Sequence, residues 1–228
     1  MIGLISDVHG NAPALEAVLD SLDGMGVEQI VCLGDVAGYY SEVNACCAML
    51  RARQVPTIMG NHDWYLGSGA SCERSRSAND CLDYQRRVIE PDHLEWLRRL
   101  PRDMQVSGLR LIHGGWRDPL EEYLVPSDAY FEALDGTFFA SGHLHVQYVW
   151  KGGQVTYCNP GAVGQPRDGD ARAAFATWDG TEFSLHRVPY DVDRTAAAMQ
   201  AAGFSEYYYE NLYAGARIGG TLSRRPVD

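Results

Sequence analysis

Five short stretches of this 228-residue chain gather carboxylate, amide and imidazole side chains, the groups that ligate metals or transfer protons. In chain order they are Asp7-Val8-His9, Gly34-Asp35, Gly60-Asn61-His62-Asp63, His113 and Gly142-His143-Leu144-His145. Five of the seven histidines lie in these stretches, and each stretch follows a short apolar run typical of a buried strand. The third stretch alone is also typical of an Asx-type turn. Together, the five favour a functional site built on strand-end loops.

The donor set consists of oxygen and nitrogen atoms. Two aspartates, one asparagine and several histidines suit Mn²⁺, Fe, Zn²⁺, Ni²⁺ or Co²⁺ and do not suit a metal that seeks thiolates. One ion could not use all of them, whereas two ions about 3.5 to 4 Å apart could, if one carboxylate bridges them. Such a pair lowers the pKa of a bridging water and holds the attacking and leaving oxygens of a displacement at phosphorus.

The first half of the chain predicts alternating strands and helices that would bring these stretches together. Residues 2–6, 29–33 and 57–59 have the apolar, β-branched character of buried strands, and residues 13–25 and 42–53 have helical spacing. Successive strand–helix units form a parallel sheet, and the carboxyl ends of its strands lie at one edge. We therefore expect the first three stretches to converge.

The second half predicts shorter elements around the remaining histidines. Strands are expected at 104–106, 109–112 and 137–140, hairpins at 147–158 and 173–188, and helices at 81–89, 91–100, 127–134, 192–202 and 207–216. Residues 67–79, rich in Gly, Ser, Ala and Arg, indicate a mobile loop beside the site. No linker or repeat divides the chain, so we expect a single domain over residues 1–218 and a disordered tail over 219–228.

Composition excludes several classes of function. A net charge of -11 and a pI near 5.0 argue against broad nucleic-acid binding, so an anionic substrate must be held by a local feature such as a metal or an arginine. No apolar stretch of about 20 residues and no signal-peptide pattern is present, which predicts a cytoplasmic protein without membrane association. The six cysteines form no CxxC pair and are expected to be reduced thiols. The oligomeric state stays open.

The five stretches, in this order, resemble the signature of the calcineurin-like metallophosphoesterases, which runs D-x-H, G-D, G-N-H-D/E, H and G-H-x-H. They extend over roughly two-thirds of the chain, which makes the resemblance far more specific than any single motif. Residues 159–167, Asn-Pro-Gly-Ala-Val-Gly-Gln-Pro-Arg, also resemble a stretch of the compact YfcE-like phosphodiesterase branch. The resemblance implies an α/β fold, a four-layer αββα sandwich of two mixed β-sheets flanked by helices.

The resemblance also implies roles for the residues of the five stretches. One metal ion would be held by Asp7, His9, Asp35 and His145, and a second by Asp35, Asn61, His113 and His143. Asp35 would bridge the two ions, and His62 would donate a proton to the leaving oxygen or contact the transition state. For Asp63 we expect a structural role.

Two residues outside the signature are candidates for substrate binding. Arg167 carries a guanidinium that matches phosphate oxygens, although a structural ion pair would explain it equally well. Asn11 lies two residues after His9 and is expected to face the same pocket.

The expected function is phosphodiester hydrolysis by a metal-bridging hydroxide, with Mn²⁺ as the favoured ion and a phosphate-ester small molecule or nucleotide as substrate. A nucleotide phosphatase or a dinucleoside-polyphosphate pyrophosphohydrolase stays open, because the same hydroxide can attack any accessible phosphorus. A non-catalytic interaction scaffold is the third possibility, since a fold does not by itself determine function.

Overall fold

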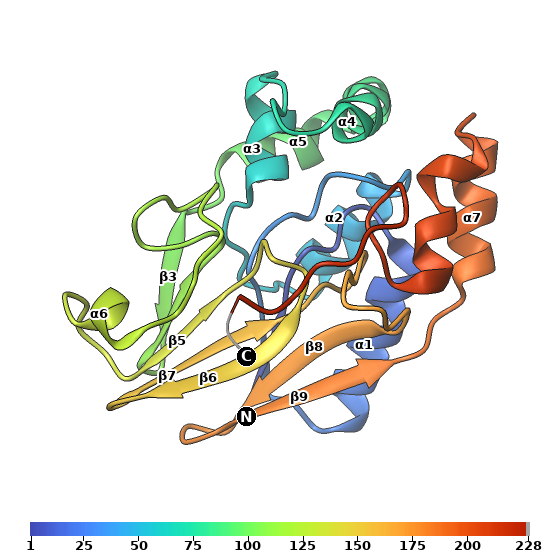
Figure 1. Ribbon diagram of the computed structural model, residues 1–228. Coiled ribbons are helices and arrows are strands. Elements are labelled where there is room, and N and C mark those ends of the chain that lie inside the picture. Colours follow the sequence, from blue (N-terminus) through green and yellow to red (C-terminus); the bar gives the residue numbers. More distant parts are fainter. Residues whose placement is uncertain (227–228) are drawn as a thin grey trace.

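Two mixed β-sheets form the centre of the molecule, and helices flank them (Figure 1). This is a computed structural model, and it describes residues 1–226. The predicted fold class, two mixed sheets with helices on their outer faces, is confirmed.

The first sheet has four strands in the order β2-β1-β8-β9. β1 pairs in parallel with β2 and antiparallel with β8, and β8 and β9 form an antiparallel hairpin. The strands are β1 (Ile2–Ile5), β2 (Gln29–Cys32), β8 (Ala173–Trp178) and β9 (Phe183–Val188). Every residue of β1 and β8 is buried, because the other sheet covers one face and helices cover the other. Such strands have continuous apolar sequences rather than alternating ones.

The second sheet has five strands in the order β3-β4-β5-β7-β6. β4, β5 and β7 are parallel, and the two edge strands are antiparallel to their neighbours. The strands are β3 (Asp103–Val106), β4 (Leu109–Ile112), β5 (Phe138–Ser141), β6 (Gln147–Gly152) and β7 (Val155–Pro160).

The helices form separate groups around the sheets. In Figure 1, α3, α4 and α5 lie together at one end of the molecule, and α7 lies beside α1. The α-helices are α1 (Ala12–Gly24), α2 (Val43–Ala52), α3 (Asn61–Ser68), α4 (Arg76–Val88), α5 (Pro91–Arg98), α6 (Asp128–Phe131) and α7 (Val192–Ala201), followed by the 3₁₀ turns η1 (Glu206–Tyr208) and η2 (Glu210–Ala214). None of the helices in the described part of the chain has the length and apolar content needed to cross a bilayer.

Apolar side chains from both sheets form the core between them. Leu4 and Ala176 of the first sheet pack in one cluster with Leu111 and Ala140 of the second. A separate cluster joins the outer face of the first sheet to α1, α2 and α7, and a third joins α6 to the outer face of the second sheet. Each of these three clusters thus lies between two adjacent layers of the four-layer fold.

Several elements differ from the prediction. α4 starts at Arg76 rather than at 81, because Ser75 caps it by accepting the N–H of Ala78 at 3.1 Å, so residues 76–79 of the expected loop are helical. The helix expected at 127–134 is shorter and covers Asp128–Phe131. The strand expected at 57–59 is a single parallel bridge between Cys32 and Thr57, because the N–H of Met59 donates instead to the carbonyl of Pro101. α3 starts directly at Asn61, where a loop was expected. The helix expected at 207–216 is divided into two 3₁₀ turns at Tyr209, whose φ of -138° is not helical.

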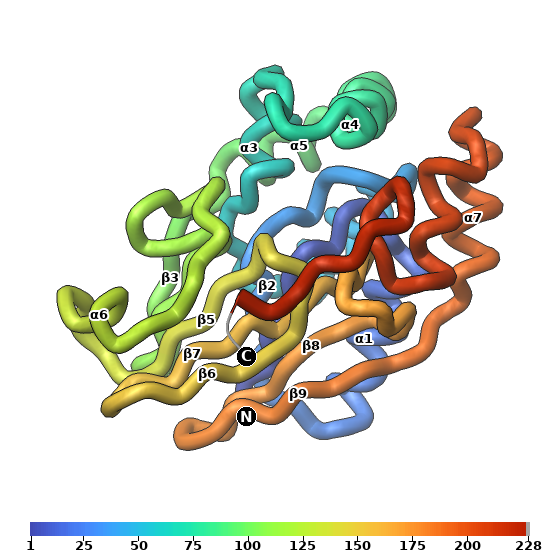
Figure 2. Tube along the Cα trace, in the orientation of Figure 1, coloured from blue at the N-terminus to red at the C-terminus, as the bar shows by residue number. Residues whose placement is uncertain are grey.

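The C-terminal segment, residues 217–226, runs across the strand ends in Figure 2. The backbone N–H of Ser223 donates a hydrogen bond to the carbonyl of Arg167 at 2.7 Å. Disorder from residue 219 onward stays a prediction, and positions 227 and 228 of that tail lie outside the described residues.

The core between the sheets should account for much of the stability. Leu4→Ala removes a fully buried side chain there and should lower the free energy of unfolding by about 2–5 kcal/mol, through lost burial and a residual cavity. Leu185→Ala is the matched control, because Leu185 of β9 is 38% exposed, and it should cost less than about 1 kcal/mol. Urea unfolding of both variants measures the difference, and equal losses would contradict this assignment of the core.

Candidate metal centre

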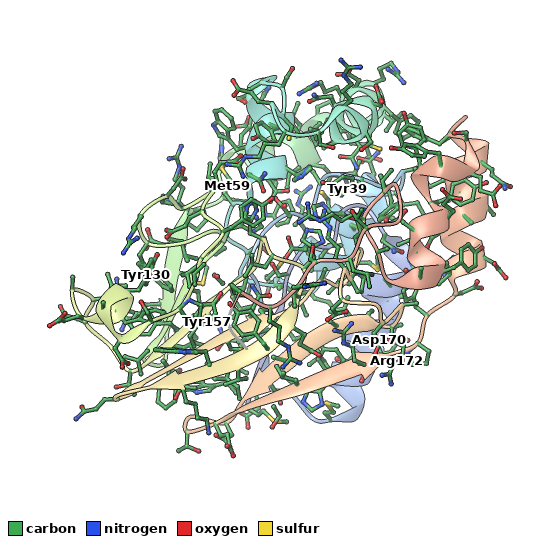
Figure 3. All side chains as sticks on the ribbon, in the orientation of Figure 1. Tyr39, Met59, Tyr130, Tyr157, Asp170 and Arg172 are labelled. Carbon is green, nitrogen blue, oxygen red and sulfur yellow. The ribbon has the colours of Figure 1, made fainter. Side chains whose placement is uncertain are left out.

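The loops at the carboxyl ends of β1, β2, β4 and β5 meet at one edge of the sandwich. The loops after β1 and β2 are joined by their backbones, since the N–H groups of Asp7 and His9 donate to the carbonyls of Gly34 and Asp35 at 3.0 and 2.9 Å. The loop after β5 joins them, with His145 Nε2 3.1 Å from His9 Nε2. Figure 3 labels Tyr39, whose ring centre lies 4.8 Å from that of His9.

The first acceptor cluster consists of Asp7, His9 and His145, to which Asp35 contributes one oxygen. His9 Nδ1 donates to the carbonyl of Ala37 at 2.9 Å, and His145 Nδ1 donates to the carbonyl of Gln165 at 2.7 Å. Each Nε2 therefore presents a lone pair, and the two face each other at 3.1 Å. Asp7 Oδ1, 3.2 Å from His145 Nε2, is buried without a hydrogen-bond partner in the described chain. Converging buried lone pairs of this kind fit a cation.

The second acceptor cluster consists of Asp35, Asn61, His113 and His143. His113 Nδ1 donates to the carbonyl of Leu33 at 2.8 Å, which turns Nε2 toward Asn61 Oδ1 at 3.1 Å and Asp35 Oδ2 at 3.4 Å. His143 Nε2 is buried and, within residues 1–226, has no hydrogen-bond partner. This set also fits a cation.

Asp35 lies between the two clusters. Its Oδ2 is 3.7 Å from His9 Nε2 and 3.4 Å from His113 Nε2, while its Oδ1 accepts the backbone N–H of His62 at 2.8 Å. Burial opposes ionisation of this carboxyl, but the surrounding imidazoles, His113 above all, hold its pKa well below the usual range. One oxygen of an ionised carboxylate therefore faces both clusters.

The protonation states of the imidazoles also suit metal ligation. Burial lowers the pKa of His9, His143 and His145 well below the ordinary value, which keeps these rings neutral. Burial acts in the same direction on His113, but the Asp35 carboxylate outweighs it and raises the pKa of that ring to about 9. Either a proton or a cation can satisfy the second cluster, and binding of the cation releases the proton.

The backbone at these positions is strained. Seven non-glycine residues among those described have a positive φ, and five of them belong to the two clusters: Asp7 (54°), His9 (53°), Asp35 (53°), His143 (66°) and His145 (59°). Left-handed backbone in an L-residue costs on the order of 1–3 kcal/mol and persists only where the surroundings enforce it. No sequence pattern signalled this feature, which is typical of functional sites.

Gly60 and Asp63 hold the Asp35 loop in place. A Cβ on Gly60 would lie 2.1 Å from Asp35 Oδ1, so only glycine permits this approach. Asp63 accepts the N–H of Ala37 at 2.9 Å and the N–H of Gly60 at 3.0 Å, and so ties the loop after β2 to the start of α3. Each carboxylate oxygen of Asp63 thus accepts one structural hydrogen bond from the backbone.

A cavity of about 280 Å³ opens beside the clusters. His62 and Arg167 line it, together with Asp35, Asn61, His143 and His145. His62 Nδ1 is buried without a hydrogen-bond partner in the described region, and burial lowers the pKa of this ring.

Arg167 is buried and forms no ion pair with a carboxylate within residues 1–226. Its Nε and Nη2 donate to Gln165 Oε1 at 2.8 and 2.6 Å, and the guanidinium lies 5.3 Å from the centre of the Tyr39 ring. The sequence left open a structural ion pair for Arg167, and this pair is absent from residues 1–226. The positive charge of Arg167 instead faces the cavity.

The prediction that Asn11 faces the pocket is wrong. Asn11 is fully buried and caps the start of α1, where its Oδ1 accepts the N–H of Ala14 and the hydroxyl of Thr195. Its Nδ2 donates to the carbonyl of Gly164 at 2.9 Å and to the Tyr190 hydroxyl at 3.2 Å. Its polar atoms are thus engaged in structural contacts, and it does not line the cavity.

Several residues that line the cavity were not predicted from the sequence. Tyr39, Tyr123, Arg74 and Arg217 line it, and they come from four separate segments. Only Arg74 had a signal, since it lies in the loop at 67–79 that was expected beside the site.

Comparison with known proteins identifies the family. Residues 1–181 match the calcineurin-like phosphoesterase superfamily domain. The chain belongs to this superfamily. Membership implies phosphoester hydrolysis as the class of reaction and confirms the resemblance seen in the five stretches. Placement in the YfcE-like branch still rests on residues 159–167.

Relatives of this phosphoesterase cover nearly its whole length. An uncharacterized protein of Methanocaldococcus jannaschii is 30% identical over an alignment of 240 positions, and the alignment covers 94% of this chain and 98% of that protein. The crystal structure of a metallophosphoesterase from Sphaerobacter thermophilus is 33% identical, covers 94% of this chain and 98% of its own, and has a TM-score of 0.81. A hypothetical protein from Pyrococcus horikoshii has a TM-score of 0.86 at 19% identity, over 95% of this chain and 100% of its own, which shows a shared fold.

The contact between Gly60 and Asp35 generates a test of this phosphoesterase site. Gly60→Ala should displace the Asp35 carboxylate and weaken Mn²⁺ binding at least about tenfold, as expected when a metal-ligand support is lost. Gly24→Ala is the control, because a Cβ there meets nothing within 4 Å and alanine favours the helix. Equilibrium dialysis with metal analysis measures both variants, and unchanged Mn²⁺ affinity in a folded Gly60→Ala protein would refute the proposed support.

Proposed function

We propose that this protein is a dinuclear metal-dependent phosphoesterase that hydrolyses phosphodiester bonds. The observation that carries the proposal is the pair of acceptor clusters that share Asp35 Oδ2. One ion would be held by Asp7, His9, Asp35 and His145, and the other by Asp35, Asn61, His113 and His143. Mn²⁺ is the favoured ion, and Fe, Zn²⁺, Ni²⁺ or Co²⁺ would also suit these donors.

Bound there, two divalent cations would lower the pKa of a water molecule and neutralise charge on the phosphate oxygens. Two aspartates in the ligand set offset only two of the four positive charges, which leaves the site about +2. Arg167 adds a further positive charge at the cavity. This local field supports binding of a phosphate ester by a chain whose net charge is -11.

His62 is assigned to the leaving group. Neither ligand set needs it, and its ring lies 4.9 Å from the rings of both His9 and Tyr39 at the cavity wall. As an imidazolium, His62 would pass a proton to the leaving oxygen as negative charge develops, and the lowered pKa makes this acid stronger. As a neutral imidazole, it would donate a hydrogen bond to that oxygen. His62 also lies close enough to His9 and Asp35 to serve as an alternative metal ligand, so the two roles require an experimental test.

Hydrolysis of bis-p-nitrophenyl phosphate tests the proposed reaction. Activity should require added Mn²⁺ or a similar ion and should fall at least about 100-fold in Asp35→Asn, which weakens the shared ligand. Asp179→Asn, on the exposed turn between β8 and β9, is the matched control and should retain activity. Absence of turnover with every divalent metal in a folded protein would refute the proposal, and rates on a monoester and a dinucleoside tetraphosphate distinguish the alternative substrates.

The role of His62 is tested by His62→Asn. Bound Mn²⁺ should stay unchanged while turnover falls about 100- to 10,000-fold, the usual contribution of a general acid. His186→Asn is the control, because His186 lies on β9, where its Nε2 contacts the Thr177 hydroxyl at 2.8 Å. If His62→Asn loses metal, His62 is a ligand and the division of roles between Asn61 and His62 is wrong.

A further inference from the structure

The cavity beside the acceptor clusters has more positive charge than one phosphate requires. Three arginines line it, Arg74, Arg167 and Arg217, and they come from the loop before α4, the stretch after β7 and the C-terminal segment. Glu121 and Asp35 are the carboxylates among the lining residues, and Asp35 belongs to the clusters. Three guanidiniums around one cavity are notable in an acidic chain and indicate an anionic ligand.

The three arginines do not have the same surroundings. Arg74 is paired with Glu121 at 3.2 Å and lies over the Tyr123 ring at 5.3 Å, so its charge is largely offset. Arg167 has no such pair and faces the cavity close to His145. Arg217 donates from Nε to the Ser223 hydroxyl at 3.0 Å, and in the described chain no carboxylate pairs with it. Arg167 and Arg217 are therefore the two cavity arginines that no carboxylate of the described chain pairs with.

The C-terminal segment is built to present Arg217 at this cavity. On one side, Ala216 is fixed to Asn211, which donates to its carbonyl at 2.8 Å and accepts its N–H through the backbone at 3.1 Å. On the other side, a tight turn forms between the N–H of Arg217 and the carbonyl of Thr221 at 2.9 Å. These contacts hold the backbone at Arg217 and at the residue before it.

Ser223 connects Arg217 to Arg167. Its N–H donates to the carbonyl of Arg167 at 2.7 Å, and its hydroxyl accepts from Arg217 Nε at 3.0 Å. The segment thus holds a second, solvent-exposed guanidinium at the cavity that Arg167 lines, and an anion bound there would offset this positive charge. The segment also lies outside residues 1–181, which match the superfamily domain.

We infer that Arg217 and the C-terminal segment form a second anion site, and that the substrate has a second phosphate group beside the scissile one. The inference rests on the proposed function for the identity of the scissile phosphate. Arg167 would contact that phosphate near the acceptor clusters, and Arg217 would bind the second one with a charge-assisted hydrogen bond. This role requires the segment to keep the position it has in the structure, rather than the disorder that its sequence predicts.

Binding to the Mn²⁺-loaded protein tests the second site. Thymidine 3′,5′-bisphosphate should bind about tenfold or more tightly than thymidine 5′-monophosphate in titration calorimetry, as expected for one added charge-assisted hydrogen bond. Arg217→Gln should abolish this preference, so that the two nucleotides bind with about equal affinity. Arg217→Lys should keep part of the preference because the charge is kept. Arg224→Gln, in the same segment but not at the cavity, should leave the preference unchanged.

Equal affinities in the wild-type protein would overturn the inference, as would a preference that survives Arg217→Gln. Hydrolysis of thymidine 5′-(p-nitrophenyl phosphate) by the same preparation separates this outcome from failure of the proposed function. Hydrolysis without a preference for the bisphosphate overturns the second anion site alone. Arg217-dependent preference without hydrolysis of any ester overturns the proposed reaction and leaves the anion site in place.

Discussion

The buried carboxylate of Asp35 is the group on which the arrangement of this protein depends. Burial of an ionised carboxylate is unfavourable unless hydrogen bonds and nearby positive charge compensate it. Here one oxygen accepts the His62 N–H and the other faces imidazoles from both halves of the chain. The absence of a side chain at Gly60 and the two hydrogen bonds accepted by Asp63 keep the carboxylate in place.

The two sheets serve the same site through their strand ends. Parallel pairing of β1 with β2, and of β4 with β5, brings the ends of four strands to one edge, and packing of the sheets brings the two sets together. The chain then leaves each strand through left-handed backbone at the ligand positions. This strain is compatible with a stable fold because the apolar layers on both sides of each sheet hold the loops in place.

Charge is distributed in opposite ways over the whole chain and within the cavity. The chain is acidic overall, yet the walls beside the acceptor clusters contain Arg74, Arg167 and Arg217. At physiological salt the field of distant surface carboxylates is screened within about 8 Å, whereas a buried guanidinium such as Arg167 is screened much less. An acidic protein can therefore present a strongly attractive site to a phosphate ester.

The resemblance of the five stretches to a known family implied the fold class. The sequence by itself determined the order of most strands and helices, and the set of residues that lie at the strand ends. It could do so because buried strands and amphipathic helices have short-range patterns, and because successive βα units place strand ends at one edge. Only the tertiary structure decided that the carbonyls of Leu33, Ala37 and Gln165 orient the imidazoles, that Asn11 caps a helix, and that Arg217 reaches the cavity. These features depend on distances between residues far apart in the chain, such as the 3.1 Å between His9 and His145, and such distances follow from how the two sheets pack rather than from any local pattern.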